Sequence, residues 1–235
     1  MRSIKNILFV ALLLLTGCEV IPENEQLIPV EPDLSGSRTH VLLEFTGFRC
    51  VNCPTAAEIA QDLEAMYDGL LYVVSLHPAS NPFTQGKYDY TCPAADSIYQ
   101  WIGGEATTPF PAGNIDMQPF EGEWFADMSS WATMVYEAMK DSIAPSLDKA
   151  IKSYWLIEDS VLGVQTMPDG TVNDHYYHRH VLRDVNADKN LLEIKDSYTK
   201  QQLYVLTLYM DPNDRHIINA YETKLMDNSL SAMDD

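Results

Sequence analysis

Apolar residues in the first half of the chain come in short blocks that predict alternating strands and helices. Residues 41–45 are almost entirely apolar, as in a strand buried on both faces of a sheet, and residues 70–76 repeat this pattern. Between these strands, residues 54–67 have the spacing of a helix with one buried face. Its apolar positions are Ala56, Ile59, Ala60, Leu63 and Met66. The predicted order is therefore strand, loop, helix, strand.

Residues 77–144 contain further helical patterns. Residues 94–102 are expected to be helical, within an insertion that spans residues 77–106. Residues 123–142 predict a longer helix, whose apolar stripe fits core packing rather than a cofactor site. The stripe consists of Trp124, Met128, Trp131, Met134, Val135, Ala138 and Met139. Residues 38–144 are therefore expected to form one α/β domain.

The pattern changes in the C-terminal segment, residues 145–235. Four stretches rich in Tyr, Val, Leu and Thr are separated by turn signals, which is typical of antiparallel strands. Turn-forming residues at 168–170 and 211–214 suit hairpin loops. The four stretches are residues 151–167, 175–185, 202–210 and 217–225. We expect a small antiparallel β-rich module that packs against the first domain to complete its core.

The N-terminus has the features of a bacterial export signal. Arg2 and Lys5 supply positive charge, and the apolar run of residues 7–15 is too short to span a bilayer. Residues 15–18, Leu-Thr-Gly-Cys, resemble a lipobox, in which the cysteine receives the lipid. The alternative is an uncleaved anchor or a buried helix, but the apolar run stops at this motif. We expect residues 1–17 to be removed as a signal peptide.

Cleavage would make Cys18 the lipidated first residue of the mature protein. Residues 18–37 are rich in proline and acidic residues and predict an extended, lipid-anchored linker. Several acyl chains give stable anchoring, because each buried methylene contributes roughly 0.8 kcal/mol. Acidic residues soon after the cysteine resemble outer-leaflet export signals of Bacteroidetes. That resemblance is too short to decide which leaflet is used. The predicted location is the cell envelope, anchored by lipid, with the outer membrane as the expected membrane and the domain facing either the periplasm or the cell surface.

The charge balance excludes one class of partner. The chain has 34 Asp and Glu residues against 15 Lys and Arg residues, a formal net charge of −19. Such an acidic surface repels phosphate backbones, which argues against nucleic-acid binding. The same negative charge also keeps a protein soluble, and solubility alone would explain it without any binding role for the acidic residues.

The strongest chemical signal is the Cys50-Val51-Asn52-Cys53 motif between the first predicted strand and helix. Unpaired amides and the dipole at a helix N-terminus favour the thiolate form of a cysteine, and Arg49 adds positive charge beside Cys50. A lowered pKa would make Cys50 the attacking thiolate. Cys53, one turn further along, is placed to resolve the mixed disulfide. The motif predicts a dithiol–disulfide exchange centre.

Two other interpretations of the cysteines remain open. The motif could form a purely structural disulfide, although so small a ring contributes only about 2 kcal/mol to stability. Zinc could also bind Cys50, Cys53, Cys92 and His77, but their spacing lacks the paired pattern of a zinc knuckle. Cys92 itself is either a shielded free thiol or a third redox cysteine that captures Cys50.

The C-terminal segment has one chemical candidate of its own. If residues 175–185 form one strand, His178 and His180 project from the same face and could share a metal ion. Structural or surface histidines are the simpler interpretation, because only two ligands are assured.

The pattern LLEFTGFRCVNCP, residues 42–54, resembles thioredoxin-like proteins and, more narrowly, the twenty-eight-kilodalton outer-membrane lipoprotein family of Bacteroidales. The resemblance implies an α/β thioredoxin-like domain with a mixed sheet flanked by helices. It also implies a cis-proline that faces the two cysteines, for which Pro111 is the best match and Pro109 the next. Thioredoxins usually carry Trp where this chain has Arg49, which puts reductase-like handling of substrates in doubt.

Taken together, the sequence predicts thiol–disulfide exchange on envelope proteins. Cys50 would attack, Cys53 would resolve, and Pro111 with its flanking backbone would hold the substrate chain. This chemistry requires no organic cofactor, and we expect no metal ion. The rival prediction is a non-catalytic surface lipoprotein that uses the thioredoxin-like scaffold and the β-rich module to bind a protein or glycan.

Overall fold

The computed structural model describes residues 38–88, 90–141, 143 and 145–225. The predicted signal peptide, the lipidated Cys18 and the acidic linker lie outside the described residues, so cleavage and anchoring stay predictions. Within the described ranges, no helix has the length and apolar character needed to cross a bilayer.

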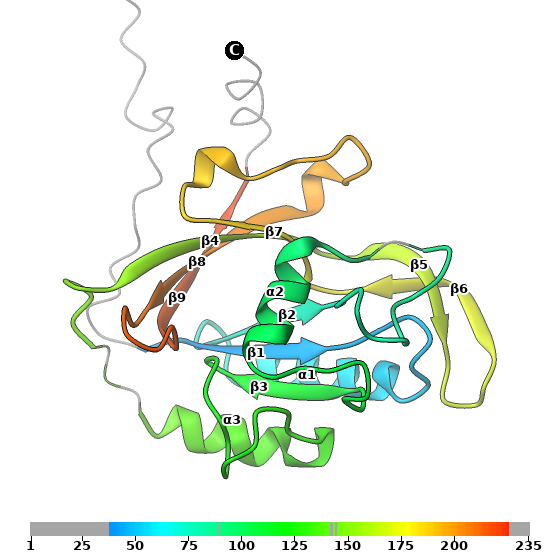
Figure 1. Cartoon of the computed structure of the whole chain (residues 1–235), viewed down its shortest axis with the longest axis horizontal. Helices are drawn as coiled ribbons and strands as arrows, with labels where there is room; N and C mark the ends of the chain where they lie inside the picture. The colour runs from blue at the N-terminus through cyan, green and yellow to red at the C-terminus, as the bar shows by residue number, and fades with distance from the viewer. Residues whose placement is uncertain (1–37, 89, 142, 144, 226–235) are drawn as a thin grey trace, which may run out of the picture. The chain divides into compact units, whose positions relative to one another are not determined.

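The described residues form one seven-stranded mixed sheet in the order β3-β1-β2-β7-β4-β8-β9 (Figure 1). Strands β1 and β2 are parallel, β3 is antiparallel to β1, and β2 meets β7 in parallel at one residue pair, Ser75 and Val181. All pairings beyond β7 are antiparallel. The strands are β1 (His40–Phe45), β2 (Leu71–Leu76), β3 (Ala112–Ile115), β4 (Ile151–Glu158), β7 (Val181–Asn186), β8 (Leu203–Met210) and β9 (Ile217–Lys224).

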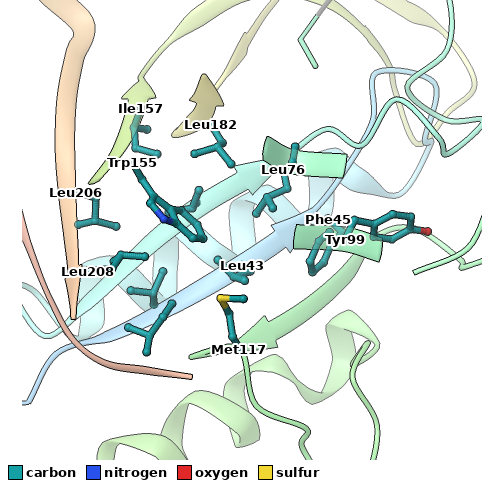
Figure 2. Packing of buried hydrophobic residues seen from close by; sticks show 14 of the residues in the cluster. Leu43, Phe45, Leu76, Tyr99, Met117, Trp155, Ile157, Leu182, Leu206 and Leu208 are labelled. Carbon is teal, nitrogen blue, oxygen red and sulfur yellow. The ribbon is translucent and has the colours of Figure 1, made fainter. Parts of the chain in front are cut away.

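Three helices cover the two faces of this sheet: α1 (Cys53–Met66), α2 (Pro93–Trp101) and α3 (Trp131–Met139). Successive residues of a strand point to opposite faces, so Leu42 packs with α1 and α3 whereas Leu43 packs on the side of α2. Figure 1 shows α2 in front of β1 and β2, and α1 behind them. The larger core lies on the α2 side, where Trp155 of β4 sits among side chains of β1, β2 and β8 (Figure 2).

The last strand returns to the beginning of the first. The Ile217 amide donates to the Asp116 carbonyl oxygen at 2.8 Å, just after β3. The Thr39 hydroxyl donates to the Ala220 carbonyl oxygen at 2.6 Å, and the Asn219 side-chain oxygen accepts from the Thr39 amide at 2.9 Å. The last strand is therefore hydrogen-bonded to the segments just before β1 and just after β3.

Strands β5 (Val161–Thr166) and β6 (Val172–His178) form a separate two-stranded antiparallel hairpin. The loop between them contains the predicted turn, where Gly170 has a φ of +81° that other residues rarely adopt. The carboxylate of Asp169 accepts hydrogen bonds from the amide and hydroxyl of Thr171, which closes the turn.

Three predicted elements have different bounds in the structure. The helix expected over residues 123–142 begins only at Trp131, because Ala126 pairs with Gly113 and Asp127 caps a short 3-10 turn. The stretch 151–167 is two strands, broken at Ser160, and the stretch 175–185 is broken at His180; both residues have positive φ. Four strands of the expected C-terminal module instead extend the sheet of the first domain.

Candidate redox site

Cys50 and Cys53 form a disulfide at the start of α1, with their Cα atoms 5.4 Å apart. Cys53 is the first residue of the helix, and Cys50 lies in the loop that follows β1. That loop rests on residue 83, since the Phe83 carbonyl oxygen accepts a hydrogen bond from the Arg49 amide at 3.0 Å. A Cβ at Gly47 would lie 2.6 Å from the same oxygen, so only glycine permits this approach. The loop thus holds both cysteines in a fixed place.

Both cysteines are almost fully buried. Cys50 is 1% exposed and Cys53 is 2% exposed, whereas Val51 between them is 42% exposed. The expected activating residue, Arg49, is exposed, and its guanidinium donates to the Gln85 carbonyl oxygen at 3.4 Å. A role of Arg49 in lowering the pKa of Cys50 therefore stays a prediction.

The peptide bond between Phe110 and Pro111 is cis, as the resemblance implied for Pro111 rather than Pro109. β3 begins at the next residue, Ala112, which pairs with Phe45 at the end of β1, just before the cysteine loop. Phe110 and Ala112 belong to the same buried cluster as Cys50 and Cys53. The fold therefore brings the proline segment and the cysteine loop to the same end of the sheet, while its role in holding a substrate stays a prediction.

Glu44 is a site residue that the sequence reasoning missed. It lies on β1, is 2% exposed, and accepts a hydrogen bond from the Ser75 hydroxyl at 3.0 Å. Burial raises the pKa of this carboxyl to about 7, although the Ser75 hydrogen bond and the charge of His180 oppose the shift. The available signal was an acidic residue inside the apolar run LLEF, six residues before Cys50.

Glu44 and Cys53 line the same small polar cavity. The cavity leaves about 10 Å³ for the centre of a water molecule, close to the space that a single water needs. Burial raises the pKa of Tyr176 to about 12, and the Glu44 charge adds to the shift, so this phenol stays neutral. Ser75, His77, Tyr176 and His178 line the same cavity. The lining therefore combines a carboxyl that ionises near neutrality with several neutral polar groups and one cation, Arg179.

The two histidines of the cavity are buried and neutral. Neither ring nitrogen of His77 has a hydrogen-bond partner, and burial holds its pKa well below the ordinary value. Burial lowers the pKa of His178 to about 4, despite its hydrogen bond to the Val164 carbonyl oxygen. Their ring centroids are 5.6 Å apart. His77, proposed above as a possible zinc ligand, thus lies beside the disulfide-bonded Cys53, whose sulfur is not a free thiolate in this state.

His178 and His180 do not share a strand face. β6 ends at His178, and the chain turns at His180, whose φ is +52°. The His178 ring contacts Tyr90, whereas His180 Nδ1 lies 2.9 Å from the Tyr204 hydroxyl. The premise of a shared metal site on one strand is therefore wrong, because the backbone turn sends the two rings in different directions. Within the described part of the chain, the group with metal-ligand spacing is Asp211, Asp214 and His216.

Cys92 is a free, buried thiol at the N-cap of α2. Its sulfur accepts a hydrogen bond from the Ala95 amide at 3.4 Å, and it is 3% exposed. Burial raises the pKa of this thiol to about 11, so it is protonated and unreactive at neutral pH. These surroundings favour the shielded-thiol interpretation over the third redox cysteine.

Among the comparisons with known proteins, one solved structure gives information on the fold. No family model matches the chain, and no curated protein matches it. Among solved structures, it is similar to HBP35 of Porphyromonas gingivalis, with a TM-score of 0.59 and 15% identity over 81% of this chain and 76% of that one. It also matches protein AGR_C_4864 of Agrobacterium tumefaciens, with a TM-score of 0.43 and 13% identity over 80% of this chain and 96% of that one. The likeness to HBP35 shows that the chain has a thioredoxin-like fold, in which Cys50 and Cys53 lie close together.

Proposed function

We propose that this protein catalyses thiol–disulfide exchange on proteins of the cell envelope. The observation that carries the proposal is the placement of Glu44, a buried carboxyl with a pKa of about 7, in the same cavity as Cys53. A cysteine leaves a disulfide as a thiolate, which a nearby acid can protonate, and a thiol must lose its proton before it attacks. A carboxyl that ionises near neutral pH can do both, so its position fits exchange better than a purely structural bond.

In the oxidised form, a client thiolate attacks the Cys50 sulfur. The bond between Cys50 and Cys53 breaks, and Cys53 leaves as a thiolate that takes the proton of Glu44. A second client thiolate then attacks the client sulfur of the mixed disulfide, so Cys50 leaves as a thiolate. The client loses two electrons and gains a disulfide, and the protein gains a dithiol. The reverse sequence reduces a client, with Glu44 accepting the Cys53 proton and Pro111 holding the client chain.

The proposed setting is the cell envelope, on either the periplasmic or the outer side of the membrane. Removal of residues 1–17 and lipidation of Cys18 would anchor the domain, through the acidic linker, to what we expect to be the outer membrane. The partners would be thiols and disulfides of envelope proteins, and the exchange needs no organic cofactor. The motif LLEFTGFRCVNCP supports membership in the twenty-eight-kilodalton lipoprotein family of Bacteroidales as part of the same proposal.

One observation favours the rival function, a non-catalytic scaffold that binds a protein or glycan. The two sulfurs belong to residues that are 1% and 2% exposed, and an attacking thiolate needs a clear path to one of them. A buried disulfide that never opens would serve only to hold the start of α1.

A trapping experiment separates the two functions. We expect a Cys53→Ser variant, in a Cys92→Ser background, to form a lasting mixed disulfide with a fluorescent disulfide peptide, because no second thiol releases it. The measurement is the labelled band on non-reducing gels, together with intact mass. Cys50→Ser in the same background is the matched control and should stay unlabelled. Equal labelling of the two variants, or no labelling of either, would favour the scaffold.

A further inference from the structure

The β5–β6 hairpin is seated directly on the cysteine loop. The Thr166 amide donates to the Phe48 carbonyl oxygen at 2.8 Å, as one strand bonds to another. Next to it, the Gln165 side-chain amide donates to the Cys50 carbonyl oxygen at 2.8 Å. Gln165 is 2% exposed although its amide is polar, so it is held by this contact rather than by solvent.

A second anchor fixes the hairpin to the insertion between β2 and β3. The Tyr90 hydroxyl accepts a hydrogen bond from the Val164 amide at 2.9 Å. A Cβ at Gly163 would lie 1.8 Å from the same hydroxyl oxygen, so the approach depends on glycine. The His178 ring, at the far end of β6, lies 4.3 Å from the Tyr90 ring, centroid to centroid. Tyr90 thus contacts both strands of the hairpin, β5 by a hydrogen bond and β6 by its ring.

The hairpin belongs to a sheet of its own, so it can move without breaking the seven-stranded sheet. Its outer side chains are open to solvent: Leu162 is 54% exposed, Val172 is 65% exposed and Tyr177 is 56% exposed. Segments with few buried contacts open locally at a lower free-energy cost than the global core. The hairpin, whose residues Gln165, Tyr176 and His178 line the cavity with Cys53, is therefore expected to open more readily than the seven-stranded sheet.

We propose that the β5–β6 hairpin is a displaceable cover over the Cys50–Cys53 disulfide, latched by Gln165 and Tyr90, and that client chains gain access by replacing it. This inference rests on the proposed exchange function. The hairpin occupies the Phe48 carbonyl oxygen with a backbone amide, that of Thr166, and the Cys50 carbonyl oxygen with the side-chain amide of Gln165. An extended polypeptide presents the same kind of backbone donors, so the expected occupant of the opened site is an extended client segment.

The test uses dithiothreitol as a small thiol that needs access but no client-binding surface. We expect Gln165→Ala to speed reduction of the disulfide about tenfold, because the latch contributes hydrogen bonds that only the closed form makes. Gly163→Ala, which pushes the hairpin off Tyr90, should act in the same direction. The exposed Gln100→Ala on α2 is the matched control and should react like wild type. Thiols are counted by alkylation and intact mass over time.

If a variant folds poorly, two further results test whether the hairpin opens. In wild type, amide exchange at Val164 and Thr166 should be faster than at Leu206 in the buried β8, because only the hairpin opens. Equal amide exchange rates at these three sites would contradict the proposal that the hairpin is a displaceable cover. A reduction rate of Gln165→Ala that equals that of wild type would also contradict it. If reduction accelerates while Cys53→Ser traps no peptide, the cover stands and the exchange function fails. If trapping succeeds while reduction is unchanged, the function stands without the cover.

Discussion

A Glu44→Gln variant should be more stable than wild type by about 3 kcal/mol above pH 7, and this advantage should disappear toward pH 4.5. Burial raises the pKa of Glu44 from 4.5 to about 7, so the folded protein keeps a proton that the unfolded chain releases. The stability that depends on this proton is complete below pH 4.5 and is lost as the pH rises through 7. The amide introduced by Glu44→Gln has a similar shape but does not ionise, so the variant loses no stability as the pH rises through 7.

Urea unfolding at several pH values between 4.5 and 8 measures this difference. Glu58→Gln, at an exposed position on α1, is the control and should not change the pH dependence. The variant should also lose the change in peptide-exchange rate near pH 7, because no group in the cavity then accepts the Cys53 proton. Parallel stability curves for wild type and Glu44→Gln would show that the pKa of this carboxyl is the same in the folded and unfolded protein, and would contradict the raised value.

Trp155→Ala should destabilise the protein by about 3–5 kcal/mol, as expected for removing a fully buried tryptophan. Trp155 is 1% exposed and lies on β4, paired with Val185 of β7 and Leu206 of β8 (Figure 2). Its ring joins strands of the C-terminal segment to the core on the α2 side. The substitution should therefore lower the stability of the cysteine loop as well as that of the C-terminal strands.

The measurement is denaturant unfolding followed by tryptophan fluorescence and by the thiol reactivity of the reduced protein. Trp101→Ala is the matched control, because that ring is 49% exposed and its loss should cost about 1 kcal/mol or less. Both probes should show one shared transition that shifts with Trp155→Ala. Two separated transitions, with the cysteine loop unaffected, would mean that the C-terminal strands fold as an independent module.

Local patterns predicted the elements around the cysteines well. The apolar blocks and helical spacing located β1, α1, β2 and α2 to within a few residues, because each signal lies within the element itself. The expected helix over residues 123–142 was too long, since the pairing of Ala126 with Gly113 depends on a strand that lies earlier in the chain. The shared sheet was also beyond local reasoning, because β2 and β7 meet across more than 100 residues, at Ser75 and Val181.

In the candidate site, too, local motifs could be recognised in the sequence, whereas contacts between distant segments could not. Cys50, Cys53 and Pro111 stand in motifs and could be named from the sequence. Glu44 also stands in the motif, but its burial and raised pKa follow from the packing of β2 and the hairpin over it. Gln165 touches Cys50 from a position 115 residues later, and no local pattern indicates that contact.

The reduction potential of the Cys50–Cys53 pair tests the central claim most directly. It is measured by equilibrating a Cys92→Ser protein in glutathione buffers of known potential and alkylating the free thiols. A pair that exchanges with client proteins should be half-reduced at a potential above about −300 mV, within reach of envelope redox partners. A potential below about −300 mV would mean that the bond persists as a structural staple, and would contradict the exchange function.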